Sequence, residues 1–117
     1  MTKTTALAMA LAAIETLRNE TRRDISSQTL SCFLHVALRG EIPMNDLIEL
    51  LDLSGAAVSR NITLLGAGTP KDPGMGLVDS FEDPHYRRRK LVRLTGKGAN
   101  LAEKAFGAMK TPAAEFI

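Results

Sequence analysis

Four consecutive cationic side chains form the densest charge cluster of the chain: Arg87, Arg88, Arg89 and Lys90. Between Glu82 and Lys97 six basic residues stand against two acidic ones, although the formal net charge of the whole chain is only +2. Guanidinium and ammonium groups bind phosphate oxygens through charge-assisted hydrogen bonds. The cluster is therefore a candidate phosphate-binding site, and the alternative is a solvated charge run that only keeps the protein soluble.

A second candidate site is a short amphipathic helix expected from Gly55 to about Leu65. Val58, Ile62 and Leu65 fall on one side of it, at spacings of four and three. The cap and the opposite side contain small, polar or basic residues and no acid, namely Ser54, Gly55, Ala56, Ser59, Arg60 and Thr63. Such a face lets the backbone approach the floor of a DNA major groove, ~12 Å wide, while Arg60 reaches base edges or phosphates. The alternative is an ordinary solvated face, which would more often contain Glu and Lys.

Other chemistry has little support in the sequence. Cys32 lies between Leu30 and Phe33, where a buried, small apolar side chain is expected rather than a redox-sensing thiol. His35 and His85 have no carboxylate or thiol nearby at metal-ligand spacing. The glycines match no phosphate-binding loop, and no serine lies in a nucleophile elbow. We therefore expect no enzymatic activity, no metal and no cofactor.

Length and composition favour one compact domain built mainly from helices. The chain has 117 residues, of which 44% are hydrophobic and only 4% aromatic, so the core must consist of aliphatic side chains that pack well between helices. It contains a single cysteine, it shows no signal-peptide pattern, and no apolar run approaches the ~20 residues that cross a bilayer. These features predict a cytoplasmic protein that does not enter the membrane.

Apolar spacing and capping residues predict two helices in the first third of the chain. The first is expected over Ala6–Asn19 with Thr5 as its cap. Ser26 or Ser27 is expected to cap the second helix, which Gly40 ends.

A helix-turn-helix is expected next. Ile42 fits a short edge strand, and Pro43 suits the first turn of a third helix that runs to about Leu51. The stretch Asp52–Leu53–Ser54 is too short for anything but a tight turn, and Ser54 is a good cap for the helix that begins at Gly55.

The second half predicts a loop, a hairpin and a last helix. Gly66–Gly76 is rich in glycine and proline, which neither a helix nor a strand tolerates. Leu77–Phe81 and Lys90–Leu94 fit two strands of a hairpin whose tip contains the arginines. Alternation along the second strand places Arg89 and Arg93 on one side. Thr95 is expected to cap the last helix.

The order of these elements is that of a winged helix-turn-helix, and the sequence resembles the MarR family of bacterial transcriptional regulators. The resemblance rests on the turn and recognition helix at Leu53–Arg60, the entry to the wing at Gly76–Val78, and the segments Asp83–Arg88 and Leu91–Gly98. It covers about Leu30 to Glu103. It implies a mainly α fold with a small β-hairpin wing (α+β).

Two departures from the family's pattern concern the wing and the loop. Tyr86 stands where the family usually has an acidic residue that pairs with the wing arginine, and Gly66–Gly76 is longer than the family's usual link. Family members often form a ligand pocket between their dimerisation and DNA-binding parts. The resemblance therefore allows a small-molecule effector, which the sequence itself does not support.

Together these observations predict one winged helix-turn-helix domain over 1–117, with the helix-turn-helix at 43–65, the wing at 77–94, and helices within 1–20 and 95–117 that contribute to dimerisation. The expected function is sequence-specific binding of double-stranded DNA by a homodimer that represses transcription at a pseudo-palindromic operator. The alternative is a winged-helix module that binds an acidic protein partner.

Specific residues are assigned to each role. The recognition helix is expected to read base edges, and the wing cations are expected to bind phosphates, with Arg87 entering the minor groove. The last helix offers Ala99, Leu101, Ala102, Ala105, Phe106 and Met109 for packing against a partner. The residues expected at the dimer interface are Leu7, Leu11, Ile14, Leu17, Leu101, Ala105 and Met109.

Overall fold

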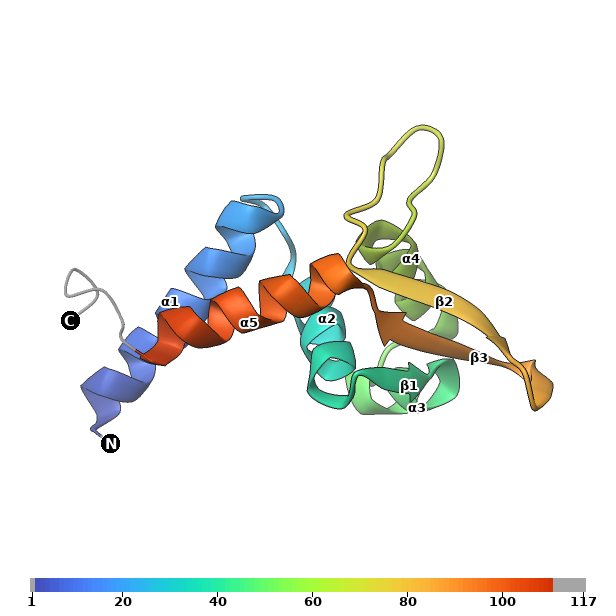
Figure 1. Ribbon diagram of the computed structural model, residues 1–117, viewed down its shortest axis with the longest axis horizontal. Helices are drawn as coiled ribbons and strands as arrows, with labels where there is room; N and C mark the ends of the chain where they lie inside the picture. Colours follow the sequence, from blue (N-terminus) through green and yellow to red (C-terminus); the bar gives the residue numbers. More distant parts are fainter. Residues whose placement is uncertain (1, 111–117) are drawn as a thin grey trace. The chain divides into compact units, whose positions relative to one another are not determined.

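The structure is a computed structural model that describes residues 2–110 (Figure 1). The chain divides into two compact units. One unit is Ser26–Ala99, and the other combines the described residues of 1–25 and of 100–117. That residues 1–117 form a single domain stays a prediction.

The unit Ser26–Ala99 contains three helices and a three-stranded antiparallel sheet in the order β1-β3-β2. Its elements are α2 (Ser27–Arg39), β1 (Glu41–Pro43), α3 (Met44–Leu51), α4 (Gly55–Leu65), β2 (Val78–Asp83), β3 (Tyr86–Leu94) and the first residues of α5 (Gly96–Lys110). This order confirms the predicted mainly helical fold with a β-hairpin wing.

Most of the predicted helix ends are confirmed. The Ser26 hydroxyl accepts a hydrogen bond from the Thr29 N–H at 3.2 Å, and Gly40 ends α2 with a φ of 77°. The Ser54 hydroxyl accepts from the Ala57 N–H at 3.1 Å. The Thr95 hydroxyl accepts from the Gly98 N–H at 3.0 Å. Each bond satisfies an N–H of a first helical turn, which has no partner inside the helix.

The sequence predicted Pro43 in the first turn of α3, and this prediction is wrong. It is the last residue of β1, opposite Leu91 of β3, and the N-cap of α3 with extended backbone angles. The preceding Ile42, the expected strand residue, is 2% exposed and pairs with Val92, and the strand also includes Glu41 and Pro43 on either side of it. β1 is an edge strand, where a proline's missing N–H breaks no ladder bond.

The inner face of α4 is buried in the core of this unit. Val58 and Leu65 are 0% exposed and Ile62 is 5% exposed. Other buried side chains of the unit come from all of its layers: Phe33, Val36, Ile42, Leu47, Val78 and Val92. Their burial is the largest favourable contribution to folding, and it determines which side of α4 faces outward.

A polar pair within this core joins α2 to α4. The Thr29 hydroxyl donates to Asn61 Oδ1 at 2.7 Å, and Asn61 Nδ2 donates to the Ala57 carbonyl at 3.0 Å. Thr29 is 2% exposed and Asn61 9% exposed. Among the described residues no buried side-chain nitrogen or oxygen lacks a hydrogen-bond partner. The pair therefore fixes α4 against α2 without leaving an unsatisfied group.

The second unit is formed by α1 (Lys3–Glu20) and the later residues of α5. α1 begins three residues earlier than predicted, because the Thr2 hydroxyl caps it by accepting from the Thr5 N–H at 3.1 Å. The predicted cap at Thr5 is therefore wrong, and Thr5 lies in the first turn. Lys104 of α5 forms an ion pair with Glu20 of α1.

Replacement of Thr29 by Val should destabilise the protein. The substitution conserves shape but leaves the buried Asn61 Oδ1 without its donor, which costs about 1–3 kcal/mol. Urea unfolding followed by circular dichroism measures the loss, and Ser31→Ala, an exposed hydroxyl two residues along the same helix, should be nearly neutral. Equal stabilities of the Thr29→Val and Ser31→Ala variants would contradict the role assigned to the pair.

Candidate nucleic-acid interface

The outer face of α4 presents all the residues that the sequence predicted there. Because Val58, Ile62 and Leu65 are turned into the core, the opposite side is open to solvent. The exposed residues are Ser54, Gly55, Ala56, Ser59, Arg60 and Thr63. Only Arg60 among them has a long side chain, so another molecule can approach the helix backbone closely at every other position.

A groove that the sequence did not predict lies beside this face. The groove has a volume of about 390 Å³ and is lined by Ser59, Arg60 and Thr63 of α4 together with Gly68, Thr69 and Asp72 of the following loop; Leu64 completes its wall. A smaller hollow of about 210 Å³ lies between the end of α4, the same loop and β2. The outer face of α4 is therefore bordered by the loop on one side.

The wing is the β2–β3 hairpin, which is longer than predicted. Its strands reach Asp83 and Tyr86, so the turn consists of Pro84 and His85 alone, and Asp83 Oδ1 accepts from the His85 N–H at 2.9 Å. This side-chain bond to the backbone two residues on is typical of tight turns that contain Asp. The tip is thus held by a local hydrogen bond.

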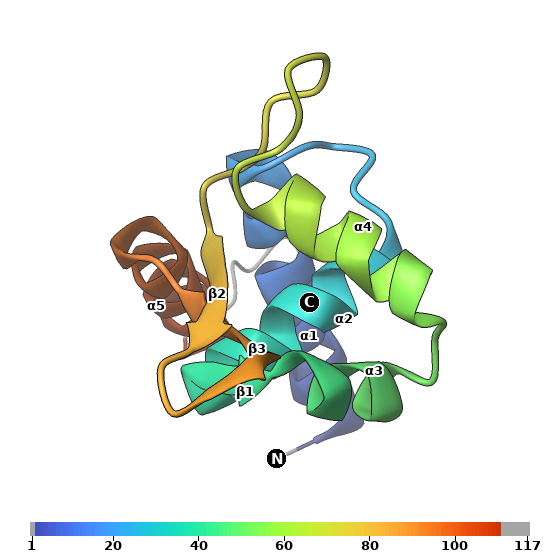
Figure 2. The same ribbon diagram turned by 90° about the vertical axis from the view of Figure 1, so that its right-hand side faces the viewer.

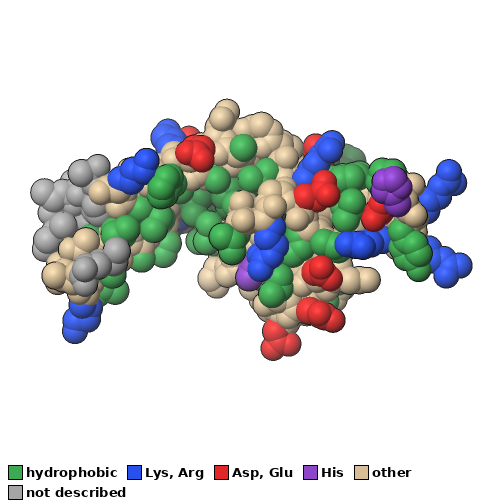
Figure 3. Space-filling view, turned by 60° about the horizontal axis from the view of Figure 1, so that its bottom comes forward, with side chains coloured by type: hydrophobic (Ala, Val, Ile, Leu, Met, Phe, Trp, Pro, Cys, Tyr) green, Lys and Arg blue, Asp and Glu red, His purple; other side chains and the backbone are tan. Residues whose placement is uncertain are grey.

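The three wing arginines lie in an irregular part of β3. Glu82 pairs with Lys90, whereas the next residue, Asp83, pairs with Tyr86. Arg87–Arg89 are therefore extra residues of β3 without a partner on β2, as in a bulge. All of them are exposed, and Figure 3 shows Lys and Arg side chains gathered at the wing end of this unit.

The wing cations differ in their partners. Arg89 Nε lies 3.9 Å from a carboxylate oxygen of Asp83, and both side chains are partly exposed, so this ion pair is weak. Asp83 thus supplies an acid for the wing, although Tyr86 replaces the family's usual one. Within the described wing, Asp83 forms this ion pair with Arg89 and not with Arg87 or Arg88.

Arg93 has a structural contact that the sequence did not predict. Its guanidinium carbon lies 4.6 Å from the centre of the Phe81 ring, a cation–π contact across the hairpin. The registers also place Arg93 opposite Glu41 of β1 and Asp79 of β2. Arg93 therefore stabilises the base of the wing, and the tip contains the cations available for a partner.

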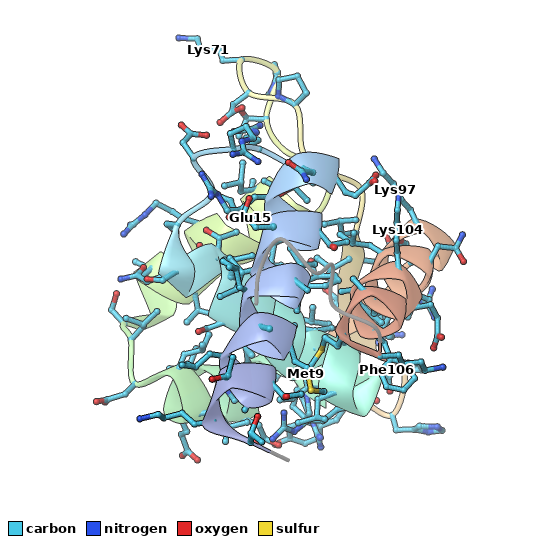
Figure 4. The ribbon with its side chains drawn as sticks, turned by 90° about the vertical axis from the view of Figure 1, so that its left-hand side faces the viewer. Met9, Glu15, Lys71, Lys97, Lys104 and Phe106 are labelled. Carbon is cyan, nitrogen blue, oxygen red and sulfur yellow. The ribbon has the colours of Figure 1, made fainter. Side chains whose placement is uncertain are left out.

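The residues predicted at a dimer interface separate into two groups. Leu17, Leu101 and Ala105 are 2%, 7% and 6% exposed, so they pack within the chain itself and are not open to a partner. Leu7, Leu11 and Ile14 are 64%, 40% and 42% exposed, Phe106 is 53% exposed, and Met109 is half-buried. Figure 4 shows Phe106 on α5. These exposed side chains form the apolar surface of the unit.

Neither histidine nor Cys32 lies in a cluster that suggests chemistry. Within residues 2–110 no three His, Cys, Asp or Glu side chains are grouped so that they could hold a metal. The Arg39 guanidinium lies 3.2 Å from His35 Nδ1, and Cys32 is 0% exposed. In the same part of the chain, no helix has the length and apolar character needed to cross a membrane.

Comparison with known proteins identifies the fold. No protein-family model and no curated protein matches the sequence. The S. aureus MepR–DNA complex is 22% identical, with a TM-score of 0.67 over 88% of this chain and 79% of that chain. A mutant of E. coli MarR in complex with operator DNA is 20% identical, with a TM-score of 0.60 over 80% and 67%. RV1404 from Mycobacterium tuberculosis is 20% identical, with a TM-score of 0.70 over 91% and 67%.

MepR and MarR are MarR-family regulators, so the fold implied by the resemblance is confirmed. The chain spans 65% of the length of another of them, a MepR mutant from a multidrug-resistant clinical isolate. NadR, a further neighbour, was solved with 4-hydroxyphenylacetate.

Cys32 should resist alkylation in the folded protein. Burial raises the pKa of its thiol from 9.0 to about 11, and the thiolate is the reactive form. At pH 8 iodoacetamide should label the native chain far more slowly than the chain in urea, and mass spectrometry measures both rates. Between pH 9 and 11 the raised pKa means that the unfolded chain loses its proton first, so stability should fall as the pH rises. Equal labelling rates would show that the thiol is accessible.

Proposed function

We propose that this protein binds double-stranded DNA sequence-specifically as a homodimer and regulates transcription, acting as a repressor in the cytoplasm. The observation that supports the proposal most directly is the combination of two surfaces on one winged-helix framework. One is the acid-free outer face of α4, and the other is the exposed cation cluster of the wing. The DNA complexes of MepR and MarR, which share the fold, add support.

In this proposal α4 enters the major groove. An α-helix with its side chains is about 10–12 Å across, which matches the groove's width of about 12 Å. Ala56, Ser59 and Thr63 let the helix backbone lie close to the base edges, and the two hydroxyl groups donate or accept single hydrogen bonds. Arg60 is long enough for a bidentate contact with guanine or for a phosphate.

The wing supplies attraction that depends little on base sequence. Arg88 and Lys90 bind backbone phosphates. Arg87 follows Tyr86, the residue of β3 that pairs with Asp83 at the hairpin turn, and it enters the adjacent minor groove. A narrow, A·T-rich minor groove has a strongly negative potential, which favours an arginine there. Arg89 contributes less, because Asp83 already pairs with it.

Replacement of Arg60 and of Arg88 by Ala should separate the two surfaces. Arg60→Ala should weaken binding to a selected operator by about 1–3 kcal/mol and weaken binding to random duplex less. Arg88→Ala should weaken both similarly and reduce the slope of log K against log salt by about 0.9 for each lost phosphate contact. Fluorescence anisotropy over a salt series, after selection of bound sites from a random pool, measures these quantities.

Arg39→Ala is the matched control, because Arg39 is an exposed arginine whose guanidinium contacts His35 of its own helix. Its affinity for DNA should equal that of the wild type. If the Arg60→Ala and Arg88→Ala variants fold normally and bind DNA as tightly as this control, DNA is not the ligand of these surfaces. An acidic protein partner would then be the better explanation of the wing.

Replacement of Leu7 by Glu should abolish the dimer. Leu7, Leu11 and Ile14 lie at helical spacing on the exposed side of α1. A two-fold interface on this side would bury the new carboxylate in apolar surroundings, which strongly destabilises the dimer. Sedimentation equilibrium should show a dimer for the wild type and a monomer for the variant. Gln28→Glu, which adds the same charge at an exposed site of α2, should remain dimeric. A monomeric wild type that saturates a pseudo-palindromic operator would contradict the proposed assembly.

A further inference from the structure

We propose that the loop between α4 and β2, residues 66–76, is a rigid DNA-binding arm that places Lys71 against the backbone phosphates beside the groove entered by α4. We refer to residues 66–76 as the arm. The proposal rests on the DNA-binding function proposed above and names one further contact of the same interface. The arm lines the groove beside the outer face of α4, and the contacts proposed above for α4 and the wing give it no role.

The arm is tied to the last turn of α4 by backbone hydrogen bonds. The Gly68 N–H donates to the Thr63 carbonyl at 2.8 Å, and the Met75 N–H donates to the Leu64 carbonyl at 2.9 Å. The Leu77 N–H, directly after the arm, donates to the Leu65 carbonyl at 2.8 Å. Both ends of the arm are therefore joined to α4, and the arm follows any placement of the helix on DNA.

The arm also has an ordered internal structure. Gly68 and Pro73 form an isolated antiparallel bridge, and a Cβ at Gly68 or Gly74 would overlap the backbone of the facing strand of the arm. At the tip, the Asp72 N–H donates to the Thr69 hydroxyl at 3.0 Å, and the Thr69 N–H donates to the Asp72 carbonyl at 2.9 Å. The two glycines thus allow the two sides to touch, and the hydrogen bonds close the tip.

The arm borders the outer face of α4 directly. Thr69 and Asp72 line the 390 Å³ groove together with Ser59, Arg60 and Thr63. Pro70 and Lys71, between them, are exposed at the tip, and Figure 4 shows Lys71 at the far end of the arm. A ligand that covers the outer face of α4 must therefore also meet the arm.

Geometry then determines which part of the DNA the arm meets. α4 alone fills a major groove about 12 Å wide, so an arm beside it must lie over a strand that borders the groove. β2 joins the arm to the wing tip, and its six residues at about 3.4 Å each span about 20 Å. Figures 1 and 2 show the arm and the wing extending in different directions. The wing and the arm consequently contact different backbone segments, and the ammonium group of Lys71 binds a phosphate.

The Lys71→Glu and Lys71→Ala variants test the phosphate contact of the arm. The matched control is Lys3→Ala, which removes an exposed lysine of α1. Each lost phosphate contact should weaken binding roughly fivefold to tenfold at 0.1 M salt, given a slope of about 0.9 per contact. Lys71→Ala should lose this factor on operator and on random duplex alike, Lys71→Glu should lose more, and Lys3→Ala should lose nothing. Titration by anisotropy at several salt concentrations measures all of these affinities.

Ethylation interference locates the contact independently of affinity. In the wild type, ethylation of one phosphate beside the recognition groove, apart from the phosphates contacted by the wing, should block binding, and this block should disappear in Lys71→Ala. A wild type that binds duplex DNA with normal salt dependence, together with a Lys71→Glu variant of unchanged affinity, would overturn the arm contact alone. A wild type that binds no duplex would instead overturn the proposed function.

Discussion

The rotation of α4 about its own axis is the constraint on which the rest of the interface depends. Two kinds of interaction fix it. Burial of Val58, Ile62 and Leu65 selects the inward side but tolerates some rolling, because apolar contacts have no direction. The Thr29–Asn61 hydrogen bond adds a direction, since a donor and an acceptor 2.7 Å apart leave little freedom. A roll of one residue would carry Asn61 out of reach of Thr29 and turn Arg60 away from the outer face.

The charge distribution of the wing follows from a second balance. Clustered cations repel one another, and the hairpin limits the repulsion by pairing one cation at its base and one near its tip with other side chains. Arg93 stacks on Phe81 between two acidic register partners, and Arg89 faces Asp83. The remaining repulsion falls on Arg87 and Arg88 in the bulge. In the proposed DNA complex a phosphate relieves this repulsion, so the gain in affinity is largest where cations of the free hairpin repel one another most.

Local signals were sufficient to predict much of this fold. Ser26, Ser54 and Thr95 cap helices through bonds to residues three positions along, so each cap is visible in a short stretch of sequence. Apart from the local cap of α1 at Thr2, the features that sequence reasoning missed depend on distant partners. Thr29 and Asn61 are separated by 32 positions, and the end of β1 at Pro43 follows from its pairing with Leu91. Composition marked the arm as a loop, but its order arises from hydrogen bonds to α4 that no local pattern reveals.

The same distinction explains the candidate site. Amphipathic spacing correctly placed all the outer-face residues of α4 on the surface, because helix periodicity is a local property. For the apolar residues of α1 and α5 the periodicity was insufficient, since Leu17 and Leu101 share their sequence character with Leu7 yet are buried. Which of these apolar side chains are buried depends on the tertiary packing of the chain, which their spacing in the sequence does not reveal.

β2 gives the interface its rigidity. Directly before β2, the Leu77 N–H donates a hydrogen bond to the Leu65 carbonyl of α4, and the Gly76 carbonyl accepts one from the Thr95 hydroxyl at 2.6 Å. The last residue of β2, Asp83, borders the wing turn. One hydrogen-bonded strand therefore joins the wing tip, the base of the arm and the end of α4. Because these three surfaces are joined in one framework, the proposed DNA contacts of each can form only at separations that the framework permits. In that proposal, selectivity for a binding site includes the spacing of phosphates as well as the identity of bases.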